Sequence, residues 1–179
     1  IGHVRYSTAG KSNIENAQPL EGHGKLGDLA VAHNGTLVNA DVLRSLLEDG
    51  GVLFQTEADS EVLLAMIARR AAKGLESAVT EAMSAVKGSY ALVMAAGDKL
   101  IGARDPHGIR PMVLGRRDDR WYLASESCAL GAVGAETVGD GAFLAAAFFD
   151  DPVGVAGCAE CGEGGVGDQV FVEVFVGIG

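Results

Sequence analysis

The chain has 179 residues, of which 48% are hydrophobic, and it carries a formal net charge of −10 at pH 7. This length and composition predict a single domain with enough apolar residues for a core, and they exclude a disordered chain. The negative charge argues against nucleic acid or an anionic membrane as a partner, and no apolar run approaches the roughly 18 residues that span a bilayer.

Cysteine content and the first residues bear on the protein's location. Three cysteines do not make a disulfide framework, and their low, odd number favours the reducing cytoplasm. The chain begins at Ile1 in what reads as the middle of a strand, with no secretory signal. We therefore expect a cytoplasmic protein of which this chain is an internal piece.

The composition divides the chain into residues 1–140 and residues 141–179. All lysines, arginines and histidines precede residue 121, whereas the second part is rich in glycine, acidic residues and phenylalanine. Domain surfaces normally mix charges of both signs. The second part is either an extra β segment, with a strand at 169–177, or a sequence not selected to fold with the rest. We assign it no chemistry.

Secondary structure is expected throughout the first part. Residues 2–7 and 28–33 read as strands, and residues 40–49 have helical apolar spacing with Asp41 as the expected N-cap. Further helices are predicted at 59–74 and 75–88, and further strands at 89–96, 99–104, 111–116 and 120–126, with a turn at 105–111. The closely spaced last strands predict an α+β fold with antiparallel sheets and helices packed on a face.

Three positions are candidates for chemistry. Asn34-Gly35 is a strong hairpin signal, yet no second alternating strand follows it directly. Arg5 is either a surface strand residue or a planar donor for a carboxylate. Asp59 is either part of a capping box with Thr56 at a helix start, or an anion that holds a substrate ammonium. An Arg and an Asp together suit an amino-acid zwitterion, although their spacing does not show that they converge.

Metal and nucleophile chemistry has weaker support. The four histidines lack partners at metal-ligand spacing, so a zinc site is not expected. Cys158 and Cys161 form a lone CxxC in the second part, which is weak evidence for a metal or redox site. Cys128 is expected to pack as a small apolar residue. Neither Ser7 nor Thr8 lies in a nucleophile elbow.

Several segments, taken together, resemble a known family. "GHVRYSTAG", "NAQPL", "AHNGTLVN", "TEADSEVLL" and "ARDPHGIRPMVLG" with "YLASESCAL" are similar to the glutaminase domain of the amidophosphoribosyltransferase family. The resemblance covers about residues 1–140 and implies an N-terminal-nucleophile fold, in which antiparallel sheets are sandwiched with helices. In this family a cysteine thiolate attacks glutamine, and the released ammonia is transferred to phosphoribosyl pyrophosphate in the first step of de novo purine biosynthesis.

The resemblance implies roles for individual residues. Asn34 and Gly35 would form the oxyanion hole, Arg5 would hold the glutamine α-carboxylate and Asp59 its α-ammonium. Tyr6 and Thr8 would line the pocket. The family also implies Mg²⁺, and in some members an iron–sulfur cluster, for the full-length protein but not for this chain, and a homo-oligomeric parent.

Two departures from the family pattern shape the expectation. No cysteine lies near the start of the chain, and residues after 140 do not continue into the family's phosphoribosyltransferase domain. We therefore expect a domain that is incomplete at its N-terminus and inactive by itself. The alternatives are a fragment of another glutamine amidotransferase, of the glucosamine-phosphate synthase type, and a non-catalytic glutamine-binding module.

Overall fold

The computed structural model describes residues 1–3, 14–97, 99–118, 120–139 and 146–150. Within these ranges the strands form two sheets in which every pairing is antiparallel. The larger sheet has the order β1 (Leu20–Gly24), β2 (Gly27–Leu37), β3 (Gly88–Ala96), β4 (Lys99–Arg104), β8 (Ala146–Asp150). The smaller sheet has the order β6 (Arg120–Ala124), β5 (Val113–Arg117), β7 (Glu136–Gly139). The predicted α+β class with antiparallel sheets is confirmed.

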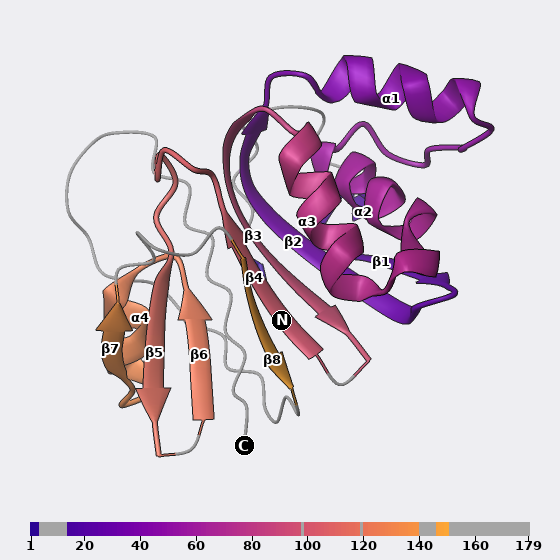
Figure 1. Ribbon diagram of the computed structural model, residues 1–179. Coiled ribbons are helices and arrows are strands. Elements are labelled where there is room, and N and C mark those ends of the chain that lie inside the picture. Colours follow the sequence, from indigo (N-terminus) through magenta and orange to yellow (C-terminus); the bar gives the residue numbers. More distant parts are fainter. Residues whose placement is uncertain (4–13, 98, 119, 140–145, 151–179) are drawn as a thin grey trace.

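Helices cover one face of the larger sheet. They are α2 (Asp59–Arg69) and α3 (Leu75–Ala85), which Figure 1 shows in front of β1, β2 and β3. Helix α1 (Ala40–Asp49) packs against α2 and lies beyond the upper end of β2. The bounds of α1 match the prediction, but its N-cap is Asn39 and not Asp41. The short helices η1 (Ile14–Asn16) and α4 (Ser127–Ala132) were not predicted, and neither were β1 and β7.

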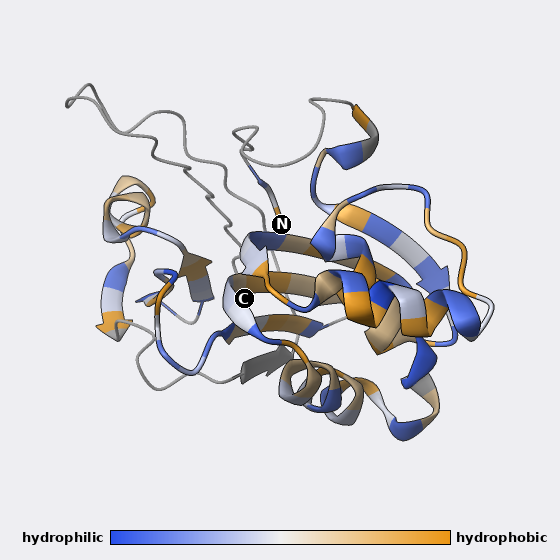
Figure 2. Cartoon of the chain, turned by 90° about the horizontal axis from the view of Figure 1, so that it is seen from above, coloured by the Kyte–Doolittle hydropathy of each residue, from blue (hydrophilic) through white to orange (hydrophobic). Residues whose placement is uncertain are grey.

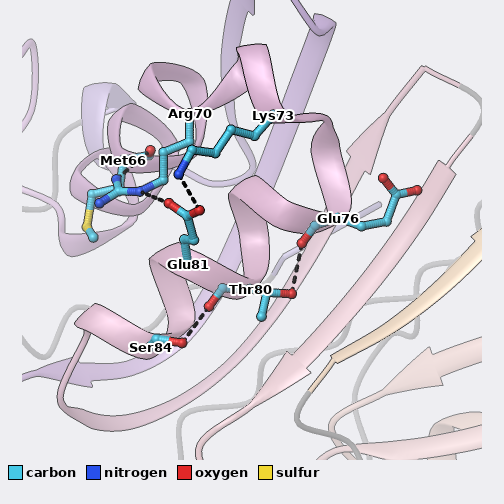
Figure 3. Close-up of polar contacts among 7 residues, drawn as sticks. All are labelled: Met66, Arg70, Lys73, Glu76, Thr80, Glu81 and Ser84. Carbon is cyan, nitrogen blue, oxygen red and sulfur yellow. Dashed lines mark hydrogen bonds and ion pairs between the residues drawn. The ribbon is translucent and has the colours of Figure 1, made fainter.

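Helix α2 ends five residues before the predicted position, because the chain tightens after Arg69. The Arg70 N–H donates to Ile67 O at 3.0 Å and the Lys73 N–H to Arg70 O at 2.9 Å, which are i→i−3 bonds, and residues 71–73 form the 3₁₀ helix η2 (Ala71–Lys73). Both basic side chains then reach Glu81 on α3, with Arg70 Nε at 3.2 Å and Lys73 Nζ at 2.6 Å (Figure 3). The hydrogen bond from Lys73 is the main cause that lowers the pKa of Glu81.

The main core lies between the helices and the larger sheet. Figure 2 shows apolar and polar residues alternating along the helices that cover the sheet. The apolar residues of α2 pack against those on one face of the central strands, and the cluster includes Val62, Leu63, Met66 and Ile67 of α2 with Val31, Leu92, Met94 and Ile101 of the sheet. Amphipathic burial of this kind supplies most of a helix's stability in a protein.

A second core joins the two sheets. Ala32, Val93 and Leu100 on the opposite face of the larger sheet pack with Met112 and Leu123. The larger sheet is therefore buried between a helical layer and a second sheet. The residues of β2 alternate between these two cores, as the period of a strand requires.

The predicted turn at 105–111 is organised by one carboxylate. Asp105 is 3% exposed, and its side chain accepts four backbone hydrogen bonds, from the N–H groups of Tyr90, His107, Ile109 and Arg110 at 3.0–3.3 Å. Burial raises the pKa of Asp105, but the four hydrogen bonds outweigh it and the pKa lies below its ordinary value. The role of Asp105 is thus to fix the turn that follows β4.

Some predictions lie at or beyond the edge of the described residues. Of the predicted strand at 2–7, residues 2 and 3 are not in a strand and the remainder lies outside the described residues. The predicted strand at 169–177 also lies outside them. Strand β8 falls within 141–179 and pairs antiparallel with β4, from Lys99 opposite Asp150 to Ala103 opposite Ala146.

Candidate functional site

The Asn34-Gly35 pair lies inside a strand and makes no turn. Strand β2 continues to Leu37, and Asn34 pairs with Ala91 and Gly35 with Tyr90 of β3. The hairpin that the dipeptide suggests is therefore absent at this position. Asn34 is 5% exposed, so its amide is held in a largely water-free environment.

Gly35 is required by backbone geometry. Its φ is +145°, and a Cβ at this position would lie 2.8 Å from Tyr90 Cα and closer still to the Ser89 carbonyl oxygen. A side chain here would collide with β3, so only glycine allows the two strands to pair at this point.

The outer edge of β2 presents three backbone N–H groups in a row. Strand β1 begins at Leu20, opposite Val31, so the ladder stops before His33. Beyond it the His33 N–H donates to the side-chain oxygen of Gln18 at 2.6 Å, and the Leu37 N–H donates to Asp59 Oδ2 at 2.9 Å. Alternate residues of a strand point their N–H groups to the same side. The N–H of Gly35 therefore points into the interval between these two side chains.

Asp59 is the first residue of α2, but it does not cap the helix. The N-cap is Ala58, and the carboxylate of Asp59 turns toward β2, where it accepts the Leu37 N–H. The predicted capping box between Thr56 and Asp59 is wrong, because the N-cap is Ala58 and the Asp59 carboxylate bonds to Leu37 instead. The carboxylate of Glu61 accepts the Gln55 N–H at 2.8 Å and the Thr56 N–H at 2.7 Å, and Thr56 Oγ1 accepts the Ala58 N–H at 3.1 Å.

The surroundings of Asp59 perturb its ionisation. Burial raises the pKa of Asp59, while the Leu37 hydrogen bond and the nearby Arg44 guanidinium oppose the rise. Asp59 Oδ1 has no hydrogen bond within the described part of the chain. A half-buried carboxylate with one oxygen unengaged is suited to a cationic group, since such a group would offset the cost of its burial.

His33 lies directly beside this row of donors and stays neutral at physiological pH. The residue is 5% exposed, and burial, together with the charges of His3 and Arg110, lowers its pKa to about 4. Its Nε2 has no hydrogen-bond partner among the described residues. The imidazole therefore adds no positive charge next to Asn34.

The structure tests only part of the sequence-predicted site. It places Asn34 and Gly35 in the middle of β2, and it places the carboxylate of Asp59 on Leu37, two residues beyond Gly35. Arg5, Tyr6 and Thr8 lie outside the described residues. Sequence reasoning missed Gln18, whose only signal was its place in "NAQPL".

The remaining sequence expectations concern metals and cysteines. No group of three or more potential metal ligands occurs in the part of the chain that the structure describes. Cys128 is exposed on α4, so the expectation that it packs as an apolar residue is wrong. Cys158 and Cys161 lie outside the described residues. No helix in the described ranges has both the length and the apolar character needed to cross a membrane.

Several curated proteins are similar in sequence to about three quarters of this chain. The chain is 46% identical over 131 residues to amidophosphoribosyltransferase 1, chloroplastic, of Arabidopsis thaliana, which covers 73% of the chain and 23% of that protein. It is 44% identical over 142 residues to the amidophosphoribosyltransferase of Archaeoglobus fulgidus, which covers 78% of the chain and 31% of that protein. The chain thus spans less than a third of the length of these relatives.

Solved structures agree with the sequence relatives. The glutamine phosphoribosylpyrophosphate amidotransferase from B. subtilis, complexed with ADP and GMP, superposes with a TM-score of 0.71 at 41% identity. The match covers 76% of this chain and 29% of that one. A structure described as the allosteric regulatory enzyme of purine biosynthesis gives a TM-score of 0.72 at 43% identity, over 76% of this chain and 30% of that one.

The family model for a glutamine amidotransferase domain matches residues 3–132. This range contains strands β1 to β6, helices α1 to α4 and all six sequence-predicted site residues. The resemblance noted in the sequence is confirmed, and the chain belongs to the glutamine amidotransferase domain family.

Proposed function

We propose that this chain is the larger part of the glutaminase domain of an amidophosphoribosyltransferase. In that enzyme glutamine-derived ammonia is transferred to phosphoribosyl pyrophosphate, which opens de novo purine biosynthesis. One observation carries the proposal beyond family membership. The Gly35 N–H points into an interval of the β2 edge that is bounded by two engaged N–H groups, with the carboxylate of Asp59 at one side.

The Asn34 amide and the Gly35 N–H are proposed to stabilise the oxyanion of the tetrahedral intermediate. Attack of a thiolate on the glutamine amide places negative charge on the carbonyl oxygen. A pre-organised donor in a dry site stabilises that charge, and losing one such donor costs about 3 kcal/mol of barrier. The burial of Asn34 and the fixed β2–β3 pairing support this role.

Asp59 is proposed to bind the α-ammonium of glutamine, and Arg5 its α-carboxylate. Tyr6 and Thr8 are proposed to line the pocket. For Asp59 the supporting observations are its half-burial, its raised pKa and its unengaged Oδ1. Binding of an ammonium at Oδ1 would lower the pKa of Asp59 again, because the cation favours the charged form.

The cysteine nucleophile that would attack glutamine is proposed to lie outside this polypeptide. The three cysteines of the chain are Cys128, Cys158 and Cys161, and none falls in the segments that resemble the family's glutaminase motifs near Asn34 and Asp59. We therefore propose that the isolated chain does not hydrolyse glutamine. Reading the DNA upstream of the Ile1 codon tests this assignment, which predicts an in-frame cysteine at the mature N-terminus of the parent.

Cofactors and partners of the parent are proposed in the same way. Mg²⁺ and phosphoribosyl pyrophosphate would bind in the phosphoribosyltransferase domain that the family resemblance implies for the parent. An iron–sulfur cluster, if the parent carries one, would also be held elsewhere. We propose a cytoplasmic homo-oligomer, with neither nucleic acid nor membrane as a partner in view of the charge of −10.

Calorimetric titration of the purified chain with L-glutamine tests the binding role. We expect Asp59→Asn to weaken binding by about tenfold or more, because a charged hydrogen bond to the ammonium is lost. Glu57→Gln is the matched control, since Glu57 is an exposed acid two residues earlier in the chain, and it should bind like the unmodified protein. A folded chain that does not bind glutamine, or binding that Asp59→Asn leaves unchanged, would contradict the proposal.

A further inference from the structure

Gln18 completes the outer edge of β2 at the point where β1 no longer does so. The β1–β2 register runs from Gly24 opposite Gly27 to Leu20 opposite Val31. If it continued, residue 18 would lie opposite His33 and a backbone carbonyl would accept the His33 N–H. The side-chain oxygen of Gln18 accepts that N–H instead, at 2.6 Å.

This acceptor matters because His33 is buried. The residue is 5% exposed, so water has little access to its backbone. A buried N–H without an acceptor costs about 1–3 kcal/mol, which β2 could avoid only by shifting toward another partner. Removing the Gln18 oxygen would thus displace the peptide that immediately precedes Asn34.

A second side chain secures the same edge from the other end. Asp59 Oδ2 accepts the Leu37 N–H at 2.9 Å, four residues beyond His33. The donor pair Asn34 and Gly35 lies between these two attachments. The direction of the Gly35 N–H is therefore set by two long-range side-chain contacts, in addition to its pairing with Tyr90.

We propose that Gln18 is a positioning residue, which holds β2 so that the Asn34 amide and the Gly35 N–H converge on the glutamine side-chain carbonyl. The proposal rests on the proposed function, because it assumes that a substrate carbonyl occupies this interval. Gln18 itself does not contact the reacting atoms. Its effect passes through the His33 peptide.

Amide hydrogen exchange, measured by NMR on the unliganded chain, tests the mechanical part. In Gln18→Met, which keeps the length of the side chain but loses the oxygen, we expect the His33 amide to exchange about tenfold faster, as the loss of one hydrogen bond implies. The Gly35 amide and the Asn34 side-chain resonances should shift, while Val93 in β3 stays unchanged. Gln18→Glu retains a carboxyl oxygen and should restore slow exchange at His33.

The control is Gln55→Met, since Gln55 is exposed and, within the described residues, only its backbone N–H is engaged, by Glu61. It should leave the exchange of His33 unchanged. Unaltered exchange and resonances at His33, Asn34 and Gly35 in Gln18→Met would overturn the proposal, whether or not the chain binds glutamine. Faster exchange throughout β2 and β3 would also overturn it, because Gln18 would then support the fold as a whole.

A pair of ligands tests the functional part. L-Norvaline has the α-ammonium and α-carboxylate of glutamine but lacks the side-chain carbonyl. We expect Gln18→Met to weaken binding of L-glutamine about tenfold and to leave L-norvaline unaffected, whereas Asp59→Asn should weaken both. Equal weakening of both ligands by Gln18→Met would overturn the positioning role. Failure of the unmodified chain to bind glutamine would instead contradict the proposed function.

Discussion

Replacing Gly35 by alanine should destabilise the protein far more than a glycine-to-alanine change at other strand positions. The φ of +145° lies in a region that is essentially reserved for glycine, and placing another residue there costs about 1–3 kcal/mol. The new Cβ would also overlap the Ser89 carbonyl. Moving β2 away from β3 to relieve this overlap would break at least one buried hydrogen bond, at a further cost of about 1–3 kcal/mol.

Two other glycines separate these contributions. Gly27 has φ +81° and open space around its Cβ position, so Gly27→Ala reports backbone strain alone and should cost about 1 kcal/mol. Gly24 has open space and no positive φ, so Gly24→Ala should change stability by less than about 0.5 kcal/mol. Gly35→Ala combines strain and overlap and should cost about 3–5 kcal/mol.

Urea denaturation followed by the fluorescence of Trp121, the single tryptophan, measures all three variants. At a constant m-value the shift of the midpoint gives the change in the free energy of unfolding. If Gly35→Ala were no more destabilised than Gly27→Ala, the close approach of β2 and β3 would not be the reason for glycine at this position. The reasoning would then be refuted.

Three further predictions concern stability. The pKa of His33 is lowered from 6.5 to about 4, so the unfolded chain takes up a proton first as pH falls through this window; stability should drop by about 3 kcal/mol between these values, and His33→Asn should remove that part of the pH dependence in urea titrations. Asp105→Ala should lower the free energy of unfolding by about 3 kcal/mol, since four backbone donors lose their acceptor; a loss below about 1 kcal/mol would contradict the role of Asp105 in the turn. Glu61→Ala should cost about 1–2 kcal/mol because the Gln55 and Thr56 N–H groups lose their partner, whereas Glu57→Ala, at an exposed acid, should leave the denaturation midpoint unchanged.

Local patterns in the sequence were sufficient for several elements. Helix α1 and strand β4 have the predicted bounds. In α1 the helical apolar spacing was sufficient, although it buries Leu47 and leaves Val42 and Leu46 exposed. In β4 a short, continuous run from Leu100 to Ala103 is buried. Helix α2 was predicted too long, because Gly74 looked like its C-terminal signal. The chain had already tightened at Arg70, where ion pairs to the distant Glu81 favour a different path. Strand β1 has few apolar residues and is specified by its pairing with β2.

In the candidate site, too, some features follow from local sequence and others depend on distant contacts. Asn34 and Asp59 stay predictions as site residues, and the resemblance was the main reason for selecting Asn34. The alternative local interpretations, a turn at Asn34 and a helix cap at Asp59, were wrong. A dipeptide that tolerates positive φ also fits inside a strand where there is no room for a Cβ. At Gly35 the lack of room is caused by the backbone of Ser89, more than fifty residues away in the sequence. The contact between Gln18 and His33 also depends on the end of the β1–β2 ladder. No short window of sequence contains that information.

The close approach of β2 and β3 has a consequence for strand alignment. A Cβ on Gly35 would overlap the Ser89 carbonyl, and a Cβ on Gly88 would overlap the Thr36 carbonyl, so each strand places a glycine against the backbone of the other. If β2 slipped by two residues along β3, the same side chains would still face the core. The hydrophobic pattern alone would therefore not disfavour the slipped pairing. Such a slip would bring His33 or Leu37 to a place that accommodates only glycine. The two glycines thus reject these slipped alignments of β2 and β3, and the pairing of Asn34 with Ala91 is fixed with them.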